Sequence, residues 1–186
     1  MSVPAKRRAT YEDLLQVPSR LVAEIVNGAL ITSPRPSPRH ARAATSLTVA
    51  IGGPFDRGAS GPGGWVILAE PELHLHGDVL VPDLAGWRRE RMPRLPERAY
   101  FELTPDWICE VLSPSTEADD RAGKMPIYAR EGVQHAWLIN PINKTLEIFR
   151  LQGGSWLSAA VHRGESTVRA EPFDAIEIDI GALWAD

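Results

Sequence analysis

Two acidic residues of this chain stand inside apolar runs, where an ionised carboxylate is costly. Glu110 lies within the run 107–112, which Ser-Pro-Ser follows, and Asp83 lies within the run 79–87. A short apolar run bounded by turn residues is typical of a strand covered on both faces. A buried carboxylate is tolerated when a cation or hydrogen-bond donors compensate it. We therefore expect a divalent cation between Asp83 and Glu110.

Each of these acids also has a simpler explanation. A proline–aspartate pair such as Pro82-Asp83 is common in ordinary turns. Glu110 could instead form an ion pair with an arginine such as Arg121. A shared cation is favoured because one ion would offset both charges.

Lys124 and Glu24 are further charged residues with two possible roles. Lys124 has Asp120 four residues before it, a spacing typical of an ion pair on a helix surface. The same lysine could reach back over the end of the Glu110 strand and orient an attacking water. Glu24 alternates with apolar neighbours, so it could simply face solvent.

Local signals predict the elements that would position these residues. A Thr-x-x-Asp capping box at 10–13 opens a short helix. The Asn-Gly pair at 27–28 joins two apolar runs and predicts a β-hairpin with a type I′ turn. Helical spacing predicts a helix over 38–51, which Gly-Gly-Pro at 52–54 would end.

The second half of the chain alternates strand and helix signals. Another Thr-x-x-Asp box at 116–119 opens a helix that Pro126 should break or restart. Short strands are expected in the tail, 159–180. The main strands are expected at about 65–76, 79–87, 106–112, 135–140 and 145–151.

Composition places the chain among folded globular proteins. It has 186 residues, of which 44% are hydrophobic, and six are tryptophan. We expect one domain over 1–186. No apolar run reaches 18 residues and no secretory signal is recognisable, so a cytoplasmic protein is expected. The single cysteine, Cys109, lies in an apolar run and is expected to be a core residue.

The net charge of −4 does not indicate a nucleic-acid-binding protein by itself, but the basic residues are clustered. Such local clusters can contact phosphates on an acidic protein, or can be ordinary solvated loops. The first basic group comprises Arg35, Arg39, His40 and Arg42. The second basic group comprises Arg88, Arg89, Arg91, Arg94 and Arg98.

Two other patterns suggest different chemistry and are weaker. His74 and His76 would share one face of a strand and could bind a transition metal, but no third ligand is close in sequence. Exposed strand histidines are the preferred interpretation. Ser113 and Ser115 lack a nucleophile-elbow pattern, so they are expected to serve a turn.

The combination of motifs resembles the PD-(D/E)XK nuclease superfamily and, more narrowly, the bacterial restriction endonuclease family of the Uma type. The resemblance rests on Pro82-Asp83, on Glu110 with the following Val-Leu-Ser-Pro-Ser, and on the later Lys124 and Tyr128. It covers nearly the whole chain. The superfamily pattern has a lysine two residues after the strand acid, where this chain has Leu112. The resemblance implies that Lys124 supplies that ammonium and that Glu24 is an auxiliary acid.

The same resemblance implies a fold and a reaction. The fold is α/β, a restriction-endonuclease-like central mixed sheet flanked by helices, with an N-terminal β-hairpin. The reaction is Mg²⁺-dependent hydrolysis of DNA phosphodiester bonds, with Mn²⁺ as a substitute metal. Asp83, Glu110 and the carbonyl of Val111 would bind the metal, since Mg²⁺ prefers oxygen ligands. Lys124 would orient the water or stabilise the transition state.

Three alternatives remain open on the sequence. The chain could be an inactive module of the same fold that binds nucleic acid or dimerises. It could also hydrolyse a small phosphorylated substrate. A homodimer could form through late-strand residues, although core packing is the preferred role for them. These residues are Trp137, Ile139, Ile148 and Phe149.

Overall fold

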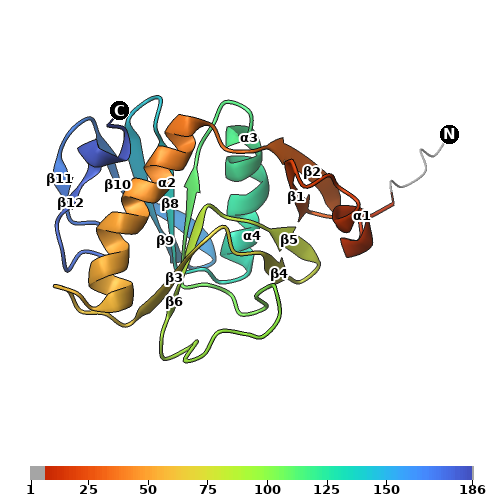
Figure 1. Ribbon diagram of the computed structural model, residues 1–186, viewed down its shortest axis with the longest axis horizontal. Coiled ribbons are helices and arrows are strands. Elements are labelled where there is room, and N and C mark those ends of the chain that lie inside the picture. Colours follow the sequence, from red (N-terminus) through yellow and green to blue (C-terminus); the bar gives the residue numbers. More distant parts are fainter. Residues whose placement is uncertain (1–6, 186) are drawn as a thin grey trace.

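A six-stranded mixed sheet forms the centre of the computed structural model, which describes residues 7–185 (Figure 1). Its strand order is β10-β9-β8-β7-β6-β3, and only β7 and β8 are parallel. This architecture confirms the expected central mixed sheet. The strands are β3 (Trp65–Ala69), β6 (Leu84–Arg88), β7 (Trp107–Val111), β8 (His135–Asn140), β9 (Thr145–Gln152) and β10 (Ser155–Arg163).

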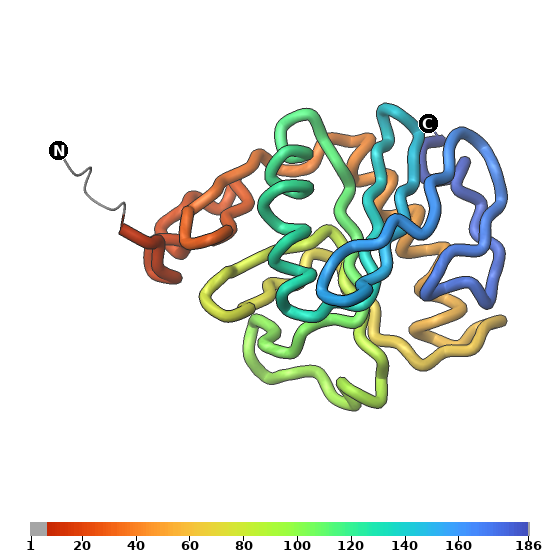
Figure 2. The backbone as a smooth tube through the Cα atoms, turned by 180° about the vertical axis from the view of Figure 1, so that it is seen from behind, coloured from red at the N-terminus to blue at the C-terminus, as the bar shows by residue number. Residues whose placement is uncertain are grey.

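A second, four-stranded sheet has the order β2-β1-β5-β4. The predicted N-terminal hairpin forms two of its strands, β1 (Leu21–Val26) and β2 (Ala29–Pro34), and φ is positive at both turn residues. The other two strands are β4 (Leu73–Leu75) and β5 (Asp78–Leu80). Figure 2 shows this hairpin at the opposite end of the molecule from the C-terminal segment. That segment contains β11 (Thr167–Val168), β12 (Ile178–Asp179) and the 3₁₀ turn Ile180–Leu183.

Helices cover both faces of the central sheet. The long helix α2 (Pro38–Ile51) packs Ala43, Leu47 and Ile51 against one face (Figure 1). The other face contacts α4 (Met125–Arg130), which follows the short α3 (Glu117–Asp119) and a π-helical turn (Asp120–Lys124). At the other end of the chain, the capping box of Thr10 opens α1 (Tyr11–Leu15), as predicted.

The central strand β7 is buried along its whole length, as expected from its apolar sequence. Alternate residues of a strand point to opposite faces of a sheet. Trp107, Cys109 and Val111 accordingly pack on the α2 side. Ile108 and Leu112 pack on the α4 side, so Glu110 shares the α4 side with them.

Two of the expected strands are each divided between the two sheets, which corrects the sequence interpretation. The run 65–76 contains β3 and β4, and the run 79–87 contains β5 and β6. Asp83 therefore lies in the crossover between the sheets and not inside a strand. Hydrophobicity stays high across each junction because both sheets bury their strands, so periodicity alone does not reveal the breaks.

The helix boundaries also differ from expectation at two points. Gly52-Gly53-Pro54 does not end the helical path, which continues after α2 as a π-helical segment (Gly52–Arg57). Thr116 makes no side-chain capping bond to α3, because its hydroxyl is paired with that of Ser113. Pro126 lies in the first turn of α4, consistent with a helix restarting there.

The late-strand residues considered for a dimer belong to the core. Trp137, Ile139 and Ile148 are buried, and Phe149 packs against the core on the α4 side. Cys109 is also buried, and burial raises the pKa of its thiol, as expected for a core residue and not for a nucleophile. Within residues 7–185, every helix is too short or too polar to cross a lipid bilayer.

Candidate active site

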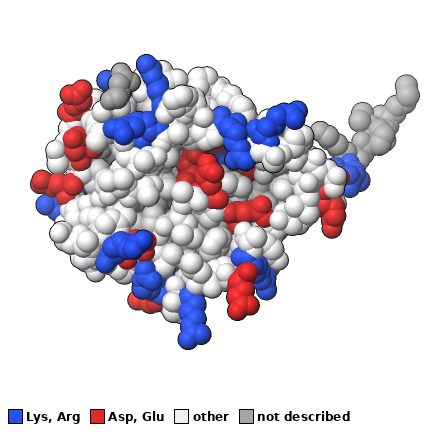
Figure 3. Space-filling model, viewed as in Figure 1, with Lys and Arg blue, Asp and Glu red and all other residues white. Residues whose placement is uncertain are grey.

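A pocket of about 230 Å³ opens where the two sheets and the start of α2 meet. Its walls come from five separate segments of the chain. Figure 3 shows acidic side chains gathered in the middle of this face of the molecule. The polar residues lining the pocket include Glu24, His40, Glu70, Asp83, Glu110, Asp120 and Lys124.

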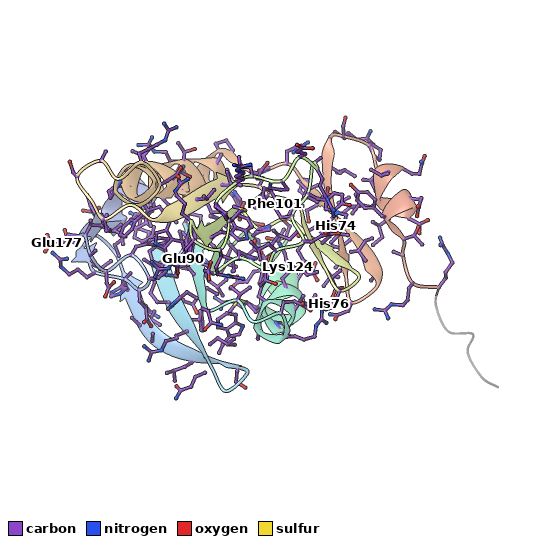
Figure 4. The ribbon with its side chains drawn as sticks, turned by 90° about the horizontal axis from the view of Figure 1, so that it is seen from below. His74, His76, Glu90, Phe101, Lys124 and Glu177 are labelled. Carbon is purple, nitrogen blue, oxygen red and sulfur yellow. The ribbon has the colours of Figure 1, made fainter. Side chains whose placement is uncertain are left out.

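Lys124 is the centre of a buried charge cluster. Its Nζ lies 3.0 Å from Asp120 Oδ1, 3.1 Å from Glu110 Oε1 and 3.2 Å from Glu24 Oε1. The residue is 5% exposed, and Figure 4 shows it at the centre of the molecule. Lys124 pairs with Asp120, as their spacing suggests, and it also reaches Glu110 on β7. The pair is buried, however, and not on a helix surface.

Burial and neighbouring charges act in opposite directions on this lysine. Burial alone would lower the pKa of Lys124, but the carboxylates of Glu110, Glu24 and Asp120 raise it well above the ordinary value. The ammonium is therefore protonated at neutral pH and offsets part of the negative charge of the pocket.

Glu110 accepts hydrogen bonds through one oxygen. Its Oε1 accepts from the hydroxyl of Tyr128 at 2.7 Å, in addition to its contact with Lys124. Burial raises the pKa of Glu110 well above the ordinary value despite the ammonium of Lys124, and the nearby acids raise it further. Additional positive charge in the pocket would therefore favour its ionised form.

Asp83 is positioned by the end of β7 and by α2. Its Oδ2 accepts from the Val111 backbone N–H at 2.7 Å, and its Oδ1 lies 3.2 Å from His40 Nε2. The antiparallel pairing of β6 and β7 places Leu84 opposite Cys109, so Asp83 comes next to Glu110. The hydrogen bond explains how Asp83 stays at the site although it is outside a strand.

Glu24 belongs to the site and does not face solvent. It is buried on β1, and its Oε1 accepts from the Val81 backbone N–H at 2.7 Å. This bond joins the small sheet to the crossover that contains Asp83. The structure thus brings together the four residues proposed from the sequence, Glu24, Asp83, Glu110 and Lys124.

Three further residues complete the cluster. Asp120 and Tyr128, both noted near Lys124 in the sequence, lie four residues before and after it, a spacing that indicates one helix face. His40 contacts Asp83 from the first turn of α2. Burial lowers the pKa of His40, but Asp83 outweighs that effect and raises it. Sequence spacing gives no signal for this contact, because it joins segments more than 40 residues apart.

The other candidate sites do not form. Arg121 pairs with Glu117 and Glu147 and not with Glu110. His74 contacts Glu72, whereas His76 lies beyond the end of β4 and its Nδ1 contacts Glu131 Oε2 at 2.5 Å. Figure 4 shows both histidines near the small sheet. The hydroxyls of Ser113, Ser115 and Thr116 hydrogen-bond within the turn after β7.

The donor set of the pocket suits a hard divalent cation. Three buried carboxylates, of Glu24, Glu110 and Asp120, surround the one buried ammonium, and Asp83 lines the same pocket. Among residues 7–185, no three His, Cys, Asp or Glu side chains are arranged to bind one metal together. Mg²⁺ does not require such a set, because it is commonly bound by one or two carboxylates, with waters and substrate phosphate completing its ligands.

Comparisons with known proteins give a family and a fold. The model of the Uma2 family, described as "Putative restriction endonuclease", matches residues 9–181. No curated protein matches the chain. The crystal structure of "a putative nuclease belonging to DUF820 from Anabaena variabilis ATCC 29413" is 22% identical and superposes with a TM-score of 0.74. The similarity covers 95% of this chain and 97% of that chain, and it shows a shared fold.

Proposed function

Because this chain belongs to the Uma2 family of putative restriction endonucleases, we propose that it is a Mg²⁺-dependent endonuclease that hydrolyses DNA phosphodiester bonds. The main support is the buried cluster in which three carboxylates surround Lys124, with Asp83 lining the same pocket. A cluster with this excess of buried negative charge is costly unless a cation binds there. A carboxylate whose pKa is perturbed in a pocket, as that of Glu110 is, is also typical of a catalytic site.

We assign the metal ligands to Asp83, Glu110 and the backbone carbonyl of Val111. Oε1 of Glu110 is already bonded to Tyr128 and Lys124, so its Oε2 is the oxygen left for a cation. A bound Mg²⁺ would lower the pKa of a coordinated water and neutralise charge on the phosphate, and Mn²⁺ could replace it.

The protein residues supply orientation and charge. Lys124 would donate hydrogen bonds to the attacking water or to a phosphate oxygen as negative charge develops there. Glu24 and Asp120 fix the position of the Lys124 ammonium through their ion pairs with it. His40 and the Val111 N–H fix Asp83. The site therefore needs little rearrangement before reaction, which is the condition for efficient electrostatic catalysis.

Cleavage of supercoiled plasmid tests this proposal. The wild-type protein should nick plasmid with Mg²⁺ and not with EDTA, and Glu110→Gln should lose that activity. Cleavage that persists unchanged in Glu110→Gln would refute the assigned chemistry. A panel of single-stranded DNA, RNA and small phosphate esters separates a DNase from nucleases and phosphatases of other specificity.

Isothermal titration with Mn²⁺ provides a test that does not depend on activity. The wild-type protein should bind Mn²⁺, and Asp83→Asn and Glu110→Gln should each weaken binding by about 10-fold or more. DNA binding without metal binding and without cleavage would favour the alternative function, an inactive nucleic-acid-binding module.

A further inference from the structure

The two basic groups of the sequence differ in how far neighbouring acids neutralise them. In the second basic group, Arg89 pairs with Asp56 at 2.9 Å and Arg91 pairs with Asp106 at 2.6 Å. Arg98 pairs with an acid four residues away, and the Arg88 guanidinium lies 4.1 Å above the centre of the Trp65 ring. Three of the five arginines of this group are therefore paired with acids.

The first basic group retains its charge at the start of α2. Arg39 and Arg42 are exposed there, and neither forms an ion pair with an acidic side chain among residues 7–185. Arg42 Nε donates to the backbone carbonyl of Ala185 at 3.3 Å. Lys144, in the turn between β8 and β9, is likewise exposed and makes no ion pair within that range.

These three cations converge on a second pocket, here called the basic pocket. It has a volume of about 480 Å³ and lies between the start of α2, the β8–β9 turn and the C-terminal segment. Apolar walls accompany the charges. The pocket is lined by Pro38, Arg39, Arg42, Pro141, Ile142, Lys144, Trp184 and Ala185.

The basic pocket and the candidate active site lie on opposite sides of one helix turn. His40 lines the acidic pocket, whereas Arg39 and Arg42 line the basic one. Figure 3 shows basic side chains along the rim beside the acidic hollow.

We propose that Arg39, Arg42 and Lys144 bind the phosphate backbone of the DNA beside the candidate active site. This inference rests on the proposed function. The carboxylates of the acidic pocket repel a polyanion, so additional cations beside the pocket are needed to raise the affinity for DNA. The walls formed by Pro38, Ile142 and Trp184 provide an apolar surface against which a deoxyribose can pack.

DNA binding by charge-matched variants tests the inference. The triple variant Arg39→Ala/Arg42→Ala/Lys144→Ala is compared with Arg57→Ala/Arg94→Ala/Arg98→Ala, which removes three exposed cations elsewhere. Both are made in the Glu110→Gln background. Fluorescence anisotropy with a labelled 20-base-pair duplex in Mg²⁺ buffer then measures affinity between about 50 and 200 mM salt.

The basic-pocket variant should bind DNA at least about 10-fold more weakly than its parent, and the slope of log K against log salt should fall by about three. The control variant should change affinity less than about twofold, because its cations lie outside the proposed path. Equal affinity and equal slope in the basic-pocket variant and its parent would overturn the inference, even if the wild-type protein cleaves DNA.

The remaining outcomes separate this inference from the proposed function. If the wild-type protein does not cleave any nucleic acid but the basic-pocket variant loses DNA binding, the proposed function fails and the backbone site stands. If the parent does not bind DNA, the backbone site is refuted. Thermal unfolding of the basic-pocket variant should match that of its parent, because all three substituted residues are exposed.

Discussion

Lys124→Met should destabilise the metal-free protein strongly, because the lysine is the one ammonium among the buried carboxylates of the pocket. Its Nζ lies 3.0 to 3.2 Å from Asp120, Glu110 and Glu24. Methionine keeps an unbranched side chain of similar length but carries no charge. The substitution therefore leaves three buried carboxylates without their common counter-charge.

The expected loss follows from the cost of breaking a buried ion pair. Removing one partner of such a pair typically costs about 3–5 kcal/mol. The lysine and all three acids are buried, so solvent screening reduces this figure little. In a domain of this size, 1 kcal/mol shifts Tm by roughly 2–4 °C, so the predicted decrease in Tm is roughly 6–20 °C.

Thermal unfolding in EDTA, followed by circular dichroism, measures this decrease. Lys144→Met is the matched control, since it removes the same charge from an exposed turn residue. It should shift Tm by no more than about 2 °C, as expected for an exposed surface position. If Lys124→Met lowers Tm no more than Lys144→Met does, the buried charge cluster does not contribute as argued.

Adding Mg²⁺ to the same samples extends the test to the metal site. A divalent cation can replace the missing positive charge, so it should raise the Tm of Lys124→Met more than that of the wild type. Mg²⁺ that changes neither Tm would refute a metal site at the cluster.

Three other predictions concern single residues. The pKa of Glu110 is raised in the folded state, so the folded protein favours the protonated carboxyl. The stability that Glu110 contributes in this way is present below about pH 4.5 and is lost as pH rises through the pKa of the folded state. In EDTA, the unfolding free energy of Glu110→Gln relative to wild type should therefore increase from pH 4.5 to 8, and urea titrations showing a constant difference would contradict this. Asp83→Asn can still accept from Val111 N–H, so its Tm should stay near that of the wild type while plasmid cleavage falls about 100-fold. If Asp83→Asn instead unfolds under the assay conditions and loses cleavage for that reason, the role of Asp83 is purely structural. A Cβ at Gly86 would lie 3.2 Å from each of two tryptophan rings, so Gly86→Ala should lower the free energy of unfolding in urea by about 1–3 kcal/mol. Gly52→Ala is the control and should not lower it, because a Cβ at Gly52 would meet open space.

Local sequence signals predicted most of the elements that form this protein. The capping box at Thr10, the Asn27-Gly28 turn and the helix over 38–51 depend on residues within a few positions of one another. The second capping box, at Thr116, was wrong because its hydroxyl bonds to Ser113 instead. A local pattern does not reveal a competing partner in the preceding turn.

Glu110 was identifiable from the sequence because an acid inside an apolar run is costly wherever the run is buried. The tertiary structure decided its partners. Glu24 and Asp83 come from the first hairpin and the crossover between sheets, and their separations from Glu110 along the chain carry no periodic signal. The less favoured alternative, in which Arg121 pairs with Glu110, was also compatible with the sequence and is wrong.

Residue type alone indicated that Asp83 and Glu110 stand where charge is expensive, and it left Glu24 and Lys124 open to a surface role. Only the tertiary structure decided that Lys124 lies within hydrogen-bonding distance of Glu24, Glu110 and Asp120 in one pocket. The same holds for the basic groups. The sequence clusters both of them, and only the structure shows that the three arginines of the first group form no ion pair among the described residues, whereas Arg89 and Arg91 of the second group do. The physical reason is that electrostatic energy depends on distances in space and on burial, and neither is fixed by separation along the chain.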